Sequence, residues 1–147
     1  MPDIRHRVRI AAPQERVYQD LTTKDGFTRW WTRAGGEEGT GGKLEFFFGE
    51  PEPGLIVEVT EQTFSHIVLH CLEGPPEWVG TDLNFRLSPT SDGGTVVLFS
   101  HEGWQEPVEF MYHCSTKWAS FLFSLKQLLE TGKGAPDPDD VAISDWH

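Results

Sequence analysis

The chain has 147 residues, and 12 basic against 23 acidic side chains give it a formal net charge of −11 at pH 7. A length in this range is typical of one domain with a single core. Strong negative charge without a dense run of Lys or Arg argues against binding to nucleic acid or to an anionic membrane surface. Because no apolar run approaches the ~20 residues of a membrane-spanning helix, and none resembles a signal peptide, we expect a cytoplasmic protein.

The nonpolar residues have an unusual balance. Six Trp and ten Phe stand against two Tyr and two Met, so we expect aromatic rings to dominate the interior. Cys71 and Cys114 are far apart and form no CxxC pattern. We interpret both as reduced, buried small hydrophobes.

The first 42 residues predict one strand and two short helices. Apolar residues and His6 alternate with arginines over residues 4–10, which is typical of a strand with one face inward. Pro13 suits the first turn of a helix, which we expect to end at Asp25–Gly26. A second short helix is expected around residues 27–31, followed by a flexible glycine-rich loop over residues 35–42.

The middle of the chain predicts an antiparallel sheet. Five strand-like runs alternate with segments rich in Gly, Pro, Asp and Ser, which set or permit turn dihedrals. The predicted strands cover residues 44–48, 55–62, 64–72, 78–87 and 95–101.

After Pro107 the apolar pattern changes to a period near 3.6 residues, which predicts a helix of about six turns ending at Thr131. Gly132 supplies the stop signal. His113 is expected on the polar side of this helix. Residues 135–147 are interpreted as an acidic, solvated tail, because their aspartates lack the glycine and glutamate of a calcium-binding loop.

Together these elements predict an α+β class: a curved antiparallel sheet of about six strands around a long C-terminal helix, with two short helices after the first strand. This order resembles the helix-grip fold of the START and pollen-allergen (SRPBCC) superfamily. Within it, the chain is most similar to the family of activator of heat-shock-protein-90 ATPase homologue-like proteins. The motifs that carry the resemblance are Val8-x-Ile10-x-Ala12-Pro13-x-x-x-Val17-Tyr18, Leu21-Thr22-Thr23-x-x-Gly26-Phe27-x-x-Trp30-Trp31, Trp78-x-Gly80-Thr81 and Thr95-x-Val97-x-Phe99-x-His101-x-Gly103-Trp104.

The resemblance covers almost the whole chain and implies one domain over residues 1–147, with a hydrophobic cavity between the sheet and the long helix. A sheet curled about one helix also leaves a wedge that aromatic rings can line without polar partners. For every candidate lining residue, plain core packing is the alternative. The candidates are Trp30, Trp31, Phe46, Phe48, Phe85, Phe99, Met111, Trp118 and Phe121.

Histidines are the main polar candidates. The resemblance places His101 on the inner face of its strand, where it could hydrogen-bond a ligand or simply be a satisfied core residue. His66 and His70 are four residues apart in a predicted strand, which separates them by about 13 Å, so we expect no metal site there. No nucleophile elbow, phosphate-binding loop or dinucleotide fingerprint is present, and we expect no cofactor.

Three hypotheses follow. The leading one is a binding module for a small apolar or aromatic molecule, oriented by His101. The second is an enzyme of the cyclase or hydrolase type with His101 as general base. The third is a protein-interaction role, as the family name suggests. We do not expect a chaperone contact, since a full co-chaperone has an additional domain, whereas a homodimer stays open.

Overall fold

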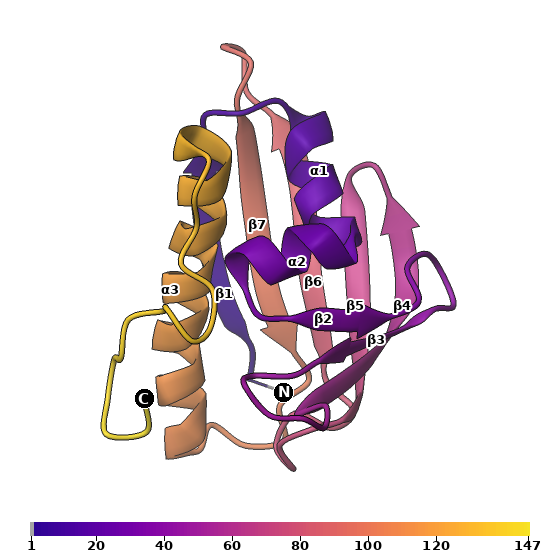
Figure 1. Ribbon diagram of the computed structural model, residues 1–147, viewed down its shortest axis with the longest axis vertical. Coiled ribbons are helices and arrows are strands. Elements are labelled where there is room, and N and C mark those ends of the chain that lie inside the picture. The colour runs from indigo at the N-terminus through magenta and orange to yellow at the C-terminus, as the bar shows by residue number, and fades with distance from the viewer. Residues whose placement is uncertain (1) are drawn as a thin grey trace.

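The computed structural model describes residues 2–147 and has the predicted helix-grip architecture. Seven antiparallel strands form one curved sheet in the order β1-β7-β6-β5-β4-β3-β2, and the three helices lie in front of it in Figure 1. The strands are β1 (Ile4–Ile10), β2 (Ala34–Gly36), β3 (Lys43–Phe46), β4 (Leu55–Thr63), β5 (His66–Glu73), β6 (Asp82–Pro89) and β7 (Thr95–Glu102). The helices are α1 (Gln14–Thr22), α2 (Lys24–Trp30) and α3 (Glu109–Thr131).

Strand β1 connects the sheet to α3. Ile4, Val8 and Ile10 are buried, whereas the three intervening arginines face water, as the alternation predicts. The inward-facing His6 places its Nε2 atom 3.0 Å from the carbonyl oxygen of Ser115 on α3. One edge strand is thereby tied to the middle of the long helix.

The boundary between α1 and α2 differs from the sequence prediction. The break falls at Thr23, which has extended dihedrals, and Gly26 lies inside α2. The Thr23 hydroxyl accepts a hydrogen bond from the Gly26 N–H at 3.0 Å and so caps the new helix. A Cβ atom at position 26 would lie 2.5 Å from the Cα of Asp20, so this glycine allows the two helices to approach closely.

Two segments of the sheet were predicted wrongly. Residues 34–36 form β2, in which Ala34 pairs with Phe46, although Gly35 and Gly36 were expected to belong to the flexible loop. Strand pairing uses backbone groups, so a glycine-rich segment can join a sheet without a side-chain pattern. Trp78 was expected to begin a strand but lies in a turn, where its backbone N–H donates to the Pro75 carbonyl at 2.8 Å.

Helix α3 confirms its predicted end. Gly132 adopts a left-handed conformation with φ 89° and its N–H donates to the carbonyl of Leu128 at 2.9 Å. The face toward the sheet carries the predicted apolar stripe. Its buried members are Met111, Cys114, Trp118, Phe121, Leu122, Leu125, Leu128 and Leu129. In the described part of the chain, no helix combines the length and apolarity needed to cross a membrane.

The C-terminal segment, residues 135–147, is folded back along α3 (Figure 1). Most of residues 141–147 are exposed, as the prediction of a solvated tail implies, whereas residues 135–137 are partly buried and Asp140 is buried. The Ala135 N–H donates to the Ser124 hydroxyl at 2.7 Å, and the Asp137 N–H donates to the Trp31 carbonyl, also at 2.7 Å. Asp140 is only 6% exposed, because Lys117 on α3 supplies a cationic partner for its carboxylate.

Candidate functional site

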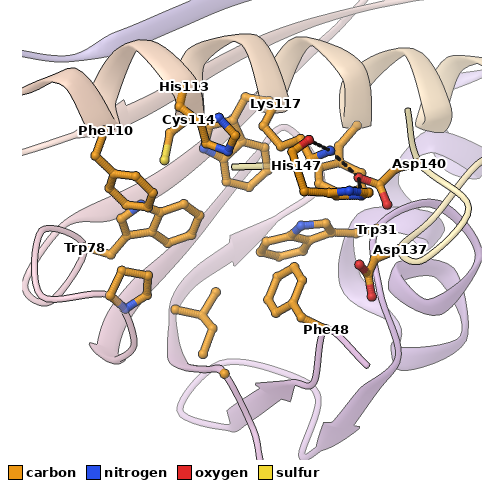
Figure 2. A pocket seen from close by; sticks show the side chains of 15 residues that line it. Trp31, Phe48, Trp78, Phe110, His113, Cys114, Lys117, Asp137, Asp140 and His147 are labelled. Carbon is orange, nitrogen blue, oxygen red and sulfur yellow. Dashed lines mark hydrogen bonds and ion pairs between the residues drawn. The ribbon is translucent and has the colours of Figure 1, made fainter. Parts of the chain in front are cut away.

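A cavity of about 260 Å³ lies between α3, the end of α2, the loop after β3 and the C-terminal segment (Figure 2). Aromatic and other apolar side chains line most of it, and charged groups gather at one end. The lining residues are Trp31, Phe48, Gly54, Leu55, Pro75, Trp78, Phe110, His113, Cys114, Lys117, Trp118, Phe121, Asp137, Asp140 and His147.

Three tryptophans form a continuous aromatic wall. The Trp118 ring from α3 stacks on Trp78 with centroids 5.8 Å apart and an interplanar angle of 19°. It also contacts Trp31, with centroids 5.1 Å apart, and Phe48 meets Trp31 edge-on at 5.7 Å. Such offset and edge contacts are favourable geometries for aromatic rings. The pocket therefore presents rigid, largely apolar surfaces.

The neighbouring tryptophans Trp30 and Trp31 have different roles. Trp31 is the C-terminal cap of α2, and its ring lines the cavity. Trp30 stacks on it at 5.8 Å but is fully buried in the core, and its Nε1 atom donates to the carbonyl of Asp20 at 2.8 Å. One of the pair therefore faces the pocket, while the other fixes α2 against α1.

His101 is fully buried behind the pocket and holds two of its tryptophans. Trp118 Nε1 lies 3.2 Å from His101 Nδ1, and Thr81 Oγ1 lies 2.7 Å from His101 Nε2. An indole nitrogen can only donate, so Nδ1 must accept and Nε2 carries the proton. The Thr81 hydroxyl accepts that hydrogen bond and donates its own proton to the Trp78 carbonyl at 2.6 Å.

This chain of hydrogen bonds requires a neutral imidazole. Burial lowers the pKa of His101 to about 3, because the charged form loses its hydration in the core. With one ring nitrogen accepting and the other donating, neither is free to take a proton or to contact a ligand. His101 therefore acts in this arrangement by positioning Trp118 and Trp78.

The structure divides the candidates of the sequence analysis into two groups. Trp31, Phe48, Trp118 and Phe121 line the cavity. The second group lies outside the lining, in the layer behind it: Phe99 contacts Trp118 with centroids 4.5 Å apart, and Phe46 contacts Trp31 at 4.4 Å. The residues of this second group are Trp30, Phe46, Phe85, Phe99, His101 and Met111, all buried.

Several lining residues were not among those candidates. Trp78 belongs to the Trp78-x-Gly80-Thr81 motif, but it was not selected as a lining residue because the motif was assigned to a strand and not to a turn. His113 was assigned to the polar face of α3, but it lines the pocket, and its Nδ1 lies 2.7 Å from the Ser144 hydroxyl. Burial, followed by the charge of Lys117, lowers the pKa of His113. Asp137 and Asp140 gave no sequence signal beyond their charge.

Charged groups occupy the end of the pocket beside the C-terminal segment (Figure 2). Lys117 pairs closely with Asp140 and donates from Nζ to the carbonyls of Val141 at 2.8 Å and His147 at 3.0 Å. His147 Nε2 lies 3.6 Å from the Asp140 carboxylate. Burial, and then the negative charge of Asp140, raises the pKa of Asp137.

The histidines and cysteines form no metal site within residues 2–147, where no three His, Cys, Asp or Glu side chains gather suitably. His66 contacts Asn84 and Glu61, whereas His70 contacts Asp82, so the two histidines have separate partners. Cys71 and Cys114 are free and buried. Burial raises the pKa of the Cys114 thiol to about 12, so the wall of the pocket carries a neutral thiol.

The antiparallel sheet curved around α3 defines a protein of the helix-grip class. A family model described as activator of Hsp90 ATPase homolog 1-like protein matches residues 11–130, so the chain belongs to that family. The resemblance stated from the motifs is thereby confirmed.

Solved structures support the fold assignment. The Aha1 dimer from Colwellia psychrerythraea is 38% identical, with a TM-score of 0.79 and coverage of 91% of this chain and 100% of that one. Protein SSP2350 from Staphylococcus saprophyticus is 16% identical, with a TM-score of 0.74 and coverage of 90% and 95%. DynU16, a protein in the dynemicin biosynthetic locus, is 20% identical, with a TM-score of 0.74 and coverage of 90% and 48%. No curated protein matches the chain in sequence.

Proposed function

We propose that this protein binds a small apolar or aromatic molecule in the cavity between α3 and the sheet. The observation that carries the proposal is the wall of Trp31, Trp78 and Trp118 around about 260 Å³ of space. Ligand pockets are usually concave, mostly apolar and provided with a few polar groups, which describes this site. Its volume lies just below the usual range of roughly 300–1,000 Å³, so a compact ligand fits best.

The ten residues selected from the sequence take two roles in this proposal. Trp31, Phe48, Trp118 and Phe121 contact the ligand directly. Of the six others, Trp30, Phe46, Phe99 and His101 contact these rings from behind, and His101 does so through a hydrogen bond from Trp118 and one to Thr81. Preorganised walls reduce the ordering cost of binding, so the support layer contributes to affinity without touching the ligand.

The fold neighbours are compatible with this function. DynU16 belongs to the dynemicin biosynthetic locus, so the fold occurs in a protein associated with small-molecule biosynthesis. The enzyme hypothesis has less support from the geometry. Its proposed general base, His101, has its accepting nitrogen occupied by Trp118 and lies outside the cavity lining.

The test uses Phe48, which lines the cavity and is only partly buried. A ligand that binds the native state must raise its melting temperature. We therefore expect compact aromatic compounds to raise the melting temperature of the wild type, and the Phe48→Ala variant to show a smaller shift. The matched control is Phe123→Ala on α3, which is 57% exposed and lies outside the cavity. Equal shifts in both variants would contradict the proposal.

A further inference from the structure

We propose that the ligand carries a protonated amine, which the carboxylates of Asp137 and Asp140 receive at the charged end of the aromatic pocket. This inference rests on the proposed function and specifies the chemical class of its ligand: an apolar or aromatic body with one cationic head group. It begins from the distribution of charge along the cavity lining.

Charge in the lining is unbalanced. Two carboxylates, Asp137 and Asp140, face one ammonium group, that of Lys117, and the imidazole of His147, whose Nε2 lies 3.6 Å from Asp140. Lys117 is already committed, because its Nζ pairs with Asp140 and donates to two backbone carbonyls. Within residues 2–147, no Lys, Arg or His nitrogen lies within ion-pair distance of the Asp137 carboxylate. Asp137 therefore has no ion pair of its own among these residues. Lys117, His147 and a hydrogen bond with Thr32 stabilise its charge only in part, because burial and Asp140 still raise its pKa.

Asp140 adds a second unfilled acceptor. Its side chain is 1% exposed, and the Oδ1 atom is buried with no hydrogen-bond donor in the described chain. Buried carboxylate oxygens normally accept hydrogen bonds, because desolvation without a partner costs free energy. A cation bearing N–H groups would satisfy such an acceptor. The other oxygen of Asp140, Oδ2, is the one that pairs with Lys117.

The position of Asp137 brings its charge to the aromatic wall. Its N–H donates to the carbonyl of Trp31 at 2.7 Å, which fixes the segment beside that indole. Figure 2 shows Asp137 and Asp140 at the Trp31 end of the pocket, away from Trp78. An ammonium group at this end would meet a carboxylate beside the Trp31 ring. The charged hydrogen bond favours a cation over a neutral group of the same size.

The net charge of the protein and the groups around the pocket also favour a positively charged ligand. The formal net charge of −11 attracts cations toward the protein and opposes the approach of anions. At the pocket itself, burial and Lys117 lower the pKa of His113, so this side chain adds no positive charge near neutral pH. An anionic ligand such as a fatty acid would have to face two carboxylates with one engaged lysine.

The experiment compares head groups on a constant skeleton. Tryptamine, tryptophol and indole-3-acetate share an indole ring and carry an amine, a hydroxyl and a carboxylate; phenethylamine, 2-phenylethanol and phenylacetate form a second series. We expect isothermal titration calorimetry at pH 7 and low salt to show the amine binding about tenfold more tightly than the alcohol, as a charged hydrogen bond predicts. The carboxylate should bind most weakly.

Two variants assign the effect to a residue. Asp137→Asn keeps the size of the side chain and should bring the affinity for the amine down to that for the alcohol, leaving alcohol binding unchanged. Asp139→Asn removes the same charge from the same segment at an exposed position outside the lining, so the amine preference should persist. The melting temperatures of both variants confirm that the fold is intact.

The outcomes separate the two proposals. Alcohol binding equal to amine binding, or tightest binding of the carboxylate, would overturn this inference while supporting an apolar ligand site. An amine preference that survives in Asp137→Asn, or disappears equally in Asp139→Asn, would overturn the assignment to the pocket. No binding of either series to the wild type at millimolar concentrations would contradict the proposed function, and this inference with it.

Discussion

His101 shows how one buried polar side chain can organise a site that it does not enter. It links β7 to α3 through Trp118 and to the turn before β6 through Thr81. The Trp118 Nε1–H donates to His101 Nδ1, the His101 Nε2–H donates to the Thr81 hydroxyl, and that hydroxyl donates to the Trp78 carbonyl. Removing one member therefore leaves a buried donor or acceptor without a partner, which costs more than the bond itself contributes.

Substitution of Thr81 should expose this dependence. Thr81→Val preserves the shape of the side chain but leaves the His101 Nε2–H without an acceptor. We expect the free energy of unfolding to fall by about 1–3 kcal/mol in urea denaturation. Thr116→Val, at an exposed position of α3, is the matched control and should change stability by less than about 0.5 kcal/mol. Similar losses in both variants would argue against the network.

The lowered pKa of His101 also predicts a dependence of stability on pH. In the folded state His101 binds a proton with a pKa of about 3, whereas in the unfolded chain it binds the proton near its ordinary pKa of 6.5. Between these values the unfolded state holds more protons, so stability falls as pH decreases from about 6.5 toward 3.

The lowered pKa of His101 should reduce the free energy of unfolding by a few kcal/mol, up to about 5, between pH 6.5 and pH 3. Other groups also contribute to the pH dependence, among them Asp20 and Asp137, whose pKa values burial raises. The measurement is therefore a difference: urea denaturation of the wild type and of His101→Gln at pH 7, 5.5 and 4. The difference in the free energy of unfolding between the two proteins should decrease as pH falls. A difference that stays constant with pH would contradict the prediction.

At the scale of elements, contacts with α3 hold the C-terminal segment in position. Lys117 reaches it through Asp140 and through the carbonyls of Val141 and His147. Trp146 adds a contact with His113, with ring centroids 5.5 Å apart. The segment thereby forms one wall of the pocket although it belongs to no helix or strand.

Removing the lysine should release this wall. Lys117→Met keeps much of the length of the side chain but leaves the Asp140 carboxylate buried without its cation. Loss of one partner from a buried pair typically costs about 3–5 kcal/mol, more than packing of this short segment can offset. We expect faster hydrogen exchange and proteolysis within residues 135–147. Lys126→Met, which breaks the pair with Glu130, should leave that segment protected.

At the scale of the whole molecule, the relative from Colwellia psychrerythraea was solved as a dimer and is 38% identical over its full length. We propose that the present chain also forms a homodimer. Light scattering coupled to size-exclusion chromatography should then give twice the chain mass of 16.6 kDa at micromolar concentration. Since a net charge of −11 opposes self-association, the dimer fraction should rise with salt. A mass of one chain at every salt concentration would contradict the proposal.

The sequence by itself determined the fold and the family. The 3.6-residue period of α3, its Gly132 stop and the alternation in β1 are local patterns, because each reports which side of one element faces the core. The order of these elements left few ways to bury every apolar face, and the motifs indicated the same fold. Even Trp31 and Trp118 were identified as pocket candidates on this basis.

The tertiary structure decided which side chains meet. The separate roles of Trp30 and Trp31, the stacking of Trp78 on Trp118 and the pairing of Lys117 with Asp140 each depend on contacts between different segments of the chain. A local pattern cannot report such contacts: periodicity records burial, whereas hydrogen bonds and ion pairs depend on distances of about 3 Å between specific atoms. The acidic C-terminal segment had the composition of a solvated tail, and a cation on α3 gives one of its residues, Asp140, a buried place.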